Sequence, residues 1–210
     1  MTPLDENGRA RARRALMRRD RKLADVIRRV GPCSMEHRGD PYRMLVRSVV
    51  YQQLAGAAAR TIDGRLRAPW RGRYPRPEVL LAAPDVQLRA AGLSRQKIAA
   101  VRAVAQAFAA GDVSNRRLRA MDDDAVIEAV TKIHGIGVWT AHMMLMFSLG
   151  RPDVLPVGDY GVRKGAMQLY GLRDLPKPRE LEALAEPWRP YRSVASWYLW
   201  RVADTLAPGG

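Results

Sequence analysis

Residues 133–141 read Ile-His-Gly-Ile-Gly-Val-Trp-Thr-Ala, and this stretch sets the expected fold. Gly135 and Gly137 allow the backbone to turn sharply and to adopt positive φ at low cost. They also leave a surface without side chains, so a phosphate can approach the main-chain N–H groups there. The helix expected from Val138 directs its free N–H groups and the positive end of its dipole to the same place. Such a phosphate contact does not depend on base sequence.

An ordinary corner between two helices is the alternative interpretation, in which the glycines only permit the bend. Ile133 and Ile136 are placed to anchor the turn in the core, and Thr140 with Ala141 can pack closely just after it. These flanking residues favour a helix-hairpin-helix, that is, two helices joined by a backbone-binding turn.

Asp159 follows the glycine turn, within Leu155-Pro156-Val157-Gly158-Asp159-Tyr160. The simplest role for an aspartate before a helix is to cap it. The same position can hold an ionised carboxylate in a fixed orientation, where it would stabilise positive charge that develops nearby or orient a water molecule. The two roles are compatible in one residue.

The remaining pattern predicts helices nearly throughout and no substantial sheet, because no segment alternates convincingly with a period of two. Starts are expected at Asp40-Pro41, Pro84-Asp85, Ser94, Asp122, Val138 and Tyr160, and ends at Gly92, Gly111 and Gly171. Pro178 and Pro190 are expected in the first turns of the two closing helices. Residues 67–77, with three prolines and a glycine, are expected to form a surface loop.

Composition limits the function classes. The chain has 210 residues, with 36 Lys+Arg against 21 Asp+Glu, which gives a net charge of +15. This charge favours nucleic acid as the partner, although an arginine-rich proteome would give the same balance.

No apolar run reaches membrane-spanning length, so we expect no membrane association and a cytoplasmic, nucleoid-associated protein. Cys33, the only cysteine, excludes an internal disulfide and a four-cysteine metal cluster.

The glycine turn followed by Asp159 resembles the signature of the helix-hairpin-helix base-excision DNA glycosylases, and most resembles the DNA-3-methyladenine glycosylase II branch. Four further stretches agree, in the expected order from about residue 23 to residue 201: Tyr51-Gln52-Gln53-Leu54-Ala55, Gly92-Leu93-Ser94 with Lys97, Met146–Arg151, and Trp188–Ser193 running on to Trp200. The resemblance implies an all-α fold of two lobes, about residues 42–155 and about residues 1–41 with 156–210. The damaged base would be flipped into the cleft between the lobes.

The resemblance also implies roles for individual residues. Asp159 matches the catalytic aspartate. Base-binding positions fall on Trp139, Tyr160, Met143 and Trp197, with core packing as the alternative for Trp139, Tyr160 and Trp197. DNA-binding positions fall on Gly135, Ile136, Gly137, Thr140, Gln53 and Leu54. Gln53 and Leu54 match the wedge that fills the flipped nucleotide's gap, while Leu54 also fits the apolar stripe of its helix.

The same resemblance implies a structural Na⁺ or K⁺ held by the backbone carbonyls of Thr131, Ile133 and Ile136, with no other cofactor. Lyase relatives carry a lysine where this chain has Trp139, and an indole cannot form a Schiff base. We therefore expect a monomeric, monofunctional glycosylase that releases alkylated purines from double-stranded DNA. A glycosylase for neutral or deaminated bases and a non-catalytic helix-hairpin-helix DNA-binding module remain alternatives.

Overall fold

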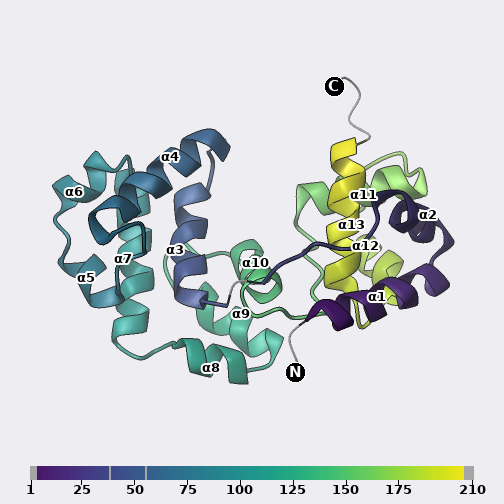
Figure 1. Ribbon diagram of the computed structural model, residues 1–210, viewed down its shortest axis with the longest axis horizontal. Coiled ribbons are helices and arrows are strands. Elements are labelled where there is room, and N and C mark those ends of the chain that lie inside the picture. The colour runs from purple at the N-terminus through teal and green to yellow at the C-terminus, as the bar shows by residue number, and fades with distance from the viewer. Residues whose placement is uncertain (1–3, 38, 55, 206–210) are drawn as a thin grey trace. The chain divides into compact units, whose positions relative to one another are not determined.

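The computed structural model describes residues 4–37, 39–54 and 56–205, and within these ranges every regular element is a helix (Figure 1). The helices are α1 (Glu6–Arg19), α2 (Arg21–Val30), α3 (Pro41–Tyr51), α4 (Gly56–Arg67), η1 (Ala68–Trp70), α5 (Pro77–Ala82), α6 (Asp85–Ala90), α7 (Arg95–Ala109), α8 (Asn115–Ala120), α9 (Asp123–Thr131), α10 (Val138–Phe147), α11 (Tyr160–Tyr170), α12 (Pro178–Ala185), η2 (Glu186–Trp188) and α13 (Arg192–Thr205). None of the helices in the described ranges is long and apolar enough to cross a membrane.

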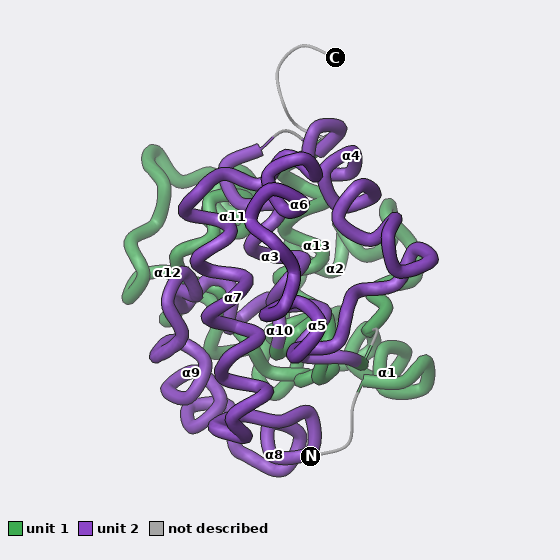
Figure 2. Tube along the Cα trace, turned by 90° about the vertical axis from the view of Figure 1, so that its left-hand side faces the viewer, with its two compact units in different colours: residues 1–39, 145–210 green, residues 40–144 purple. Residues whose placement is uncertain are grey.

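The chain divides into two compact units, coloured separately in Figure 2. Unit 1 comprises residues 1–39 and 145–210, and unit 2 comprises residues 40–144. Residues 145–155 therefore group with the terminal segments and not, as the sequence suggested, with the central one. One reason is visible in the hydrogen bonds of this stretch, because the Leu4 N–H donates to the Gly150 carbonyl at 2.9 Å and the Ser193 hydroxyl donates to the Arg151 carbonyl at 2.7 Å.

Unit 1 is built on the packing of α11 against α13, with α1 and α2 alongside. A Cβ atom at Gly165 of α11 would lie 2.1 Å from the Leu199 carbonyl oxygen of α13, so only glycine permits this approach. Asp20 joins the elements: its carboxylate caps α2 at the Leu23 N–H, and accepts from the Trp188 indole N–H at 2.8 Å and from the Tyr170 hydroxyl. The result is a core in which Trp188 is fully buried.

Unit 2 packs α3 and α5 against α7. The apolar residues that share one face of α3, including Leu45, Val46 and Val49, are fully buried. Lys97 of α7 donates from Nζ to the Val50 carbonyl at 2.5 Å, and so satisfies a free carbonyl at the C-terminal end of α3. This bond fixes the end of α3 beside α7.

Helix boundaries agree closely with the sequence signals. The side chains of Asp40, Ser94 and Asp122 each accept the capping N–H bond predicted for them. The prediction for Pro190 is wrong, because it precedes α13, which begins at Arg192. The start of α13 is set instead by Asp153, whose carboxylate accepts from the Arg192 N–H at 3.2 Å and from its Nε at 2.9 Å.

Candidate functional site

The glycine turn lies in unit 2 between α9 and α10, as predicted. The Ile136 N–H donates to the Ile133 carbonyl at 3.1 Å, and both side chains are buried, so they anchor the turn. Gly135 adopts φ +84°, and a Cβ atom there would meet the Ala100 Cβ at 2.5 Å. Glycine is therefore required at 135 both by backbone conformation and by the close approach of α7.

Gly137 differs from the expectation, because its φ is not positive. It directly precedes α10, which begins at Val138. A Cβ atom at Gly137 would meet nothing within 4 Å. No close contact therefore requires glycine at position 137, and the exposed surface that it leaves without a side chain is the kind that a phosphate can approach.

The segment after α3 is tied to the glycine turn. The Gln52 side chain donates from Nε2 to the Gly135 carbonyl at 3.0 Å. Gln53 adopts φ +54°, an uncommon conformation for a residue with a side chain. Leu54 is 38% exposed and lies beyond the end of α3 at Tyr51, so the alternative that it belongs to the apolar stripe of that helix is wrong. Gln53 and Leu54 thus project from a fixed loop beside the turn, whereas Ala55 lies outside the described residues.

The side chains at the start of α10 have very different exposures. Trp139 is 47% exposed, so simple core packing does not describe it. Thr140 is only 2% exposed, and this burial leaves no surface for the direct DNA contact that the sequence suggested. Met143 is also buried. Among these three residues, Trp139 is therefore the one that is substantially exposed.

Asp159 lies in unit 1 at the N-terminus of α11 and is nearly buried. Its Oδ1 atom accepts two hydrogen bonds, from the Val162 N–H at 2.8 Å and from the Trp200 indole N–H at 2.8 Å. The first bond is the helix cap expected from the sequence. The second comes from α13 and fixes the carboxylate from another direction, which is what a preorganised charge requires.

Trp200 is itself held in place by its neighbours. Its ring stacks on Phe147 with centroids 5.8 Å apart and planes at 26°. A Cβ atom at Gly161 would lie 2.7 Å from Trp200 Cδ1 and 3.2 Å from Asp159 Oδ1. The glycine thus leaves room for the indole to reach the carboxylate. Sequence reasoning missed this role of Trp200, although the spacing of Gly161 and Gly165 on one helix was an available sign of a close neighbour.

The other two predicted base-binding residues of unit 1 also differ in exposure. Tyr160 is 66% exposed and directly follows Asp159, so its ring is available to a ligand. Trp197 is buried; it packs edge-on against Tyr198, with centroids 5.0 Å apart, and the Arg201 guanidinium lies 4.8 Å above its ring. These contacts give Trp197 a packing role, as the alternative interpretation held.

The described residues form an all-helical fold with a glycine turn that is anchored by two buried isoleucines. An aspartate that accepts two hydrogen bonds lies at a helix N-terminus. This combination is typical of helix-hairpin-helix DNA repair proteins. A family model described as "HhH-GPD superfamily base excision DNA repair protein" matches residues 46–190. The chain belongs to this superfamily, and the all-helical helix-hairpin-helix glycosylase fold expected from the sequence is confirmed.

Two fission yeast (Schizosaccharomyces pombe) proteins are among the relatives. The "Alkylbase DNA glycosidase-like protein mag2" is 30% identical over 199 residues, which cover 91% of this chain and 92% of that protein. The "DNA-3-methyladenine glycosylase 1" is 32% identical over 193 residues, covering 90% and 85%.

Two solved structures are similar over nearly their whole length. A DNA-3-methyladenine glycosidase from Bacillus halodurans superposes with a TM-score of 0.85 at 37% identity, covering 97% of this chain and 92% of that chain. The S. pombe 3-methyladenine DNA glycosylase Mag1, in complex with abasic DNA, superposes with a TM-score of 0.82 at 32% identity, covering 91% and 95%.

Proposed function

We propose that the protein is a monofunctional DNA glycosylase that hydrolyses the N-glycosidic bond of alkylated purines in duplex DNA, by base flipping, for base excision repair. The observation that carries this proposal is Asp159, a carboxylate held by two hydrogen bonds 2.8 Å long at a helix N-terminus. The activities of the relatives named above point to the same class of substrate.

In this mechanism Asp159 acts on the sugar. Alkylation at N3 or N7 makes the purine cationic and therefore a good leaving group. As the bond between the base and the sugar lengthens, the electron pair leaves with the base and positive charge develops on the deoxyribose. The fixed carboxylate stabilises that charge and orients a water molecule whose oxygen bonds to the anomeric carbon, while the proton that this water loses passes to the carboxylate and from there to solvent. Little general acid is needed, because the base leaves as a neutral species.

The exposed aromatic rings supply base recognition. Trp139 and Tyr160 are both exposed aromatic residues, and the electron-rich faces of such rings attract a cationic base. A neutral base gains less from this contact. Selectivity for damaged bases comes also from the weaker glycosidic bond and from easier flipping.

Unit 2 supplies contacts to the DNA backbone. The glycine turn approaches a phosphate through its main-chain N–H groups, and Gln53 or Leu54 fills the gap left by the flipped nucleotide. The carbonyls of Thr131, Ile133 and Ile136 suit a Na⁺ or K⁺ ion, because carbonyl oxygens are ligands for hard cations and the Ile133 oxygen keeps a second lone pair beside its bond from Ile136. That ion would bridge the turn to a phosphate.

The residue type at position 139 also supports hydrolysis of the N-glycosidic bond without cleavage of the DNA strand. A lyase step needs an amine that can form a Schiff base with the sugar, and the indole at this position cannot do so. We further propose that the protein acts as a monomer in the cytoplasm, in association with the nucleoid.

The direct test compares three duplexes. One is methylated, one contains hypoxanthine, and one contains an abasic-site analogue. Release of methylated purines, with little release of hypoxanthine, is the expected result. Preferential release of hypoxanthine would assign the protein to neutral lesions. Tight binding to the abasic analogue, with no base released from either substrate, would make it a binding module.

A further inference from the structure

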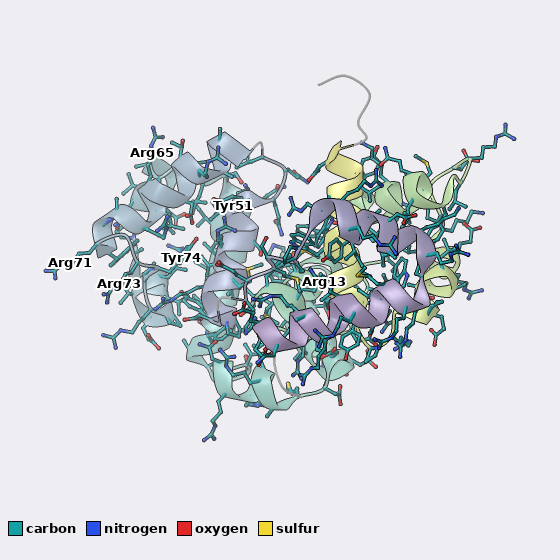
Figure 3. All side chains as sticks on the ribbon, turned by 45° about the vertical axis from the view of Figure 1, so that its right-hand side comes forward. Arg13, Tyr51, Arg65, Arg71, Arg73 and Tyr74 are labelled. Carbon is teal, nitrogen blue, oxygen red and sulfur yellow. The ribbon has the colours of Figure 1, made fainter. Side chains whose placement is uncertain are left out.

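Residues 71–76, between η1 and α5, display three arginines and are called the arginine loop below. Arg71, Arg73 and Arg76 are all exposed, as is Arg65 on the preceding helix α4. Figure 3 shows Arg65, Arg71 and Arg73 at the same end of unit 2. Within the described part of the chain no acidic side chain pairs with any of the four, so their charge is not neutralised by the protein itself.

Side chains of α4 hold the arginine loop in a fixed conformation. Asp63, which is buried, binds Arg67 through a 2.8 Å ion pair and also accepts from the Tyr74 hydroxyl. Arg67 in turn donates from Nη1 to the Gly72 carbonyl at 2.8 Å, and its guanidinium lies 5.5 Å from the centre of the Tyr74 ring. One arginine and one aspartate are thus used as internal braces, while the arginines of the loop itself are left exposed.

The backbone of the loop is also unusual. Arg71 adopts φ +54° and ψ +40°, the left-handed conformation that strongly favours glycine, although a glycine stands next to it at position 72. The turn is closed by the Gly72 N–H on the Arg67 carbonyl at 3.0 Å and by the Arg73 N–H on the Trp70 carbonyl at 3.1 Å. A side chain kept in a strained position on a braced turn points to a function for that side chain.

We propose that the arginine loop is an auxiliary binding site for the phosphodiester backbone of DNA, in addition to the glycine turn. Guanidinium groups bind phosphate oxygens in a planar, bidentate manner, and a braced loop loses little conformational freedom on binding. The inference rests on the proposed function only in that DNA is taken as the polyanion. The phosphates belong either to the damaged duplex beyond the lesion or to a second duplex.

The test measures how DNA affinity depends on salt, because each lost phosphate contact reduces the slope of log K against log salt concentration by about 0.9. The full-length variant Arg71→Gln/Arg73→Gln is compared with the wild type on a long undamaged duplex. Its slope is expected to be shallower by about 1.8. The Arg71→Lys/Arg73→Lys variant keeps the charges and should retain the wild-type slope.

A matched control removes the same charge elsewhere. Arg11 and Arg14 on α1 are exposed and have no partner among the residues that the structure describes. Arg11→Gln/Arg14→Gln should therefore leave the slope near the wild-type value. An equal change of slope in both glutamine variants, or no change in the loop variant, would overturn the proposal. Either result would mean that the loop arginines make no phosphate contact beyond the effect of general surface charge.

Two further measurements locate the phosphates and separate this inference from the proposed function. A normal slope on a short duplex that covers only the lesion, with a reduced slope on the long one, assigns the contact to flanking DNA. Loss of capture of a second labelled duplex assigns it to another DNA molecule. Single-turnover base release on the saturating short duplex should be unchanged in the loop variant. If the wild type releases no base at all, the proposed function fails while the slope comparison still stands.

Discussion

Replacing Trp200 with phenylalanine tests whether the indole positions the carboxylate. The phenyl ring can still stack on Phe147, but the N–H that donates to Asp159 Oδ1 at 2.8 Å is lost. A hydrogen bond to a charged group contributes about 1.5–3 kcal/mol. The Val162 N–H still holds the same oxygen in this variant. We therefore expect the loss of transition-state stabilisation to lie near the lower end of that range. A loss of about 1.4 kcal/mol corresponds to a tenfold slower reaction.

The assay is single-turnover base release from a methylated duplex at saturating enzyme, together with affinity for an abasic-site analogue and thermal unfolding. We expect the rate constant to fall about tenfold, with affinity little changed. The melting temperature should fall by only a few degrees, because one hydrogen bond is lost from the folded protein. Phe147→Leu removes the stacking partner but leaves the N–H and should have a smaller effect on rate. A Trp200→Phe rate within twofold of the wild type, or a loss that only follows the melting temperature, would refute the positioning role.

Other variants test the glycine turn, a half-buried histidine and the absence of a lyase step. Gly135→Ala should destabilise the protein by about 1–3 kcal/mol, because its Cβ would lie 2.5 Å from that of Ala100, whereas Gly137→Ala should keep its melting temperature and weaken DNA binding. Burial lowers the pKa of His142, so the unfolded chain binds the proton more readily than the folded one. The melting temperature should therefore fall as the pH drops below about 6.5, and this fall should be smaller in His142→Gln. Trp139→Lys should still leave an abasic duplex unnicked on a denaturing gel, because a Schiff base also requires a correctly placed amine.

Local signals in the sequence predicted the helices well. A capping side chain and a glycine stop act within one turn, so Asp40, Ser94 and Gly171 could be interpreted without tertiary structure. Pro190 could not, because the start of α13 is set by Asp153 from a different segment. The grouping of residues 145–155 likewise depends on hydrogen bonds to residues distant in the sequence.

The candidate site shows the same limit. The helix cap made by Asp159 is local and was predicted, whereas its bond from Trp200 joins helices that are far apart in the chain. The exposure of Trp139 and the burial of Thr140 also depend on how α10 packs, which residue type alone does not determine. Sequence patterns therefore indicated which residues belong to the candidate site. Only the packing showed that Trp200 holds the Asp159 carboxylate and that Thr140 is too buried for the predicted DNA contact.

The most direct measurement of the central claim is mass analysis of the bases released from methylated duplex DNA by the wild type and by Asp159→Asn. Asparagine caps a helix as well as aspartate does, so the variant should fold normally and still bind the abasic-site analogue. It lacks the negative charge that stabilises the sugar as the base departs. The wild type should release methylated purines and the variant almost none. Undiminished release by the folded variant would contradict the assignment of Asp159 as the catalytic group.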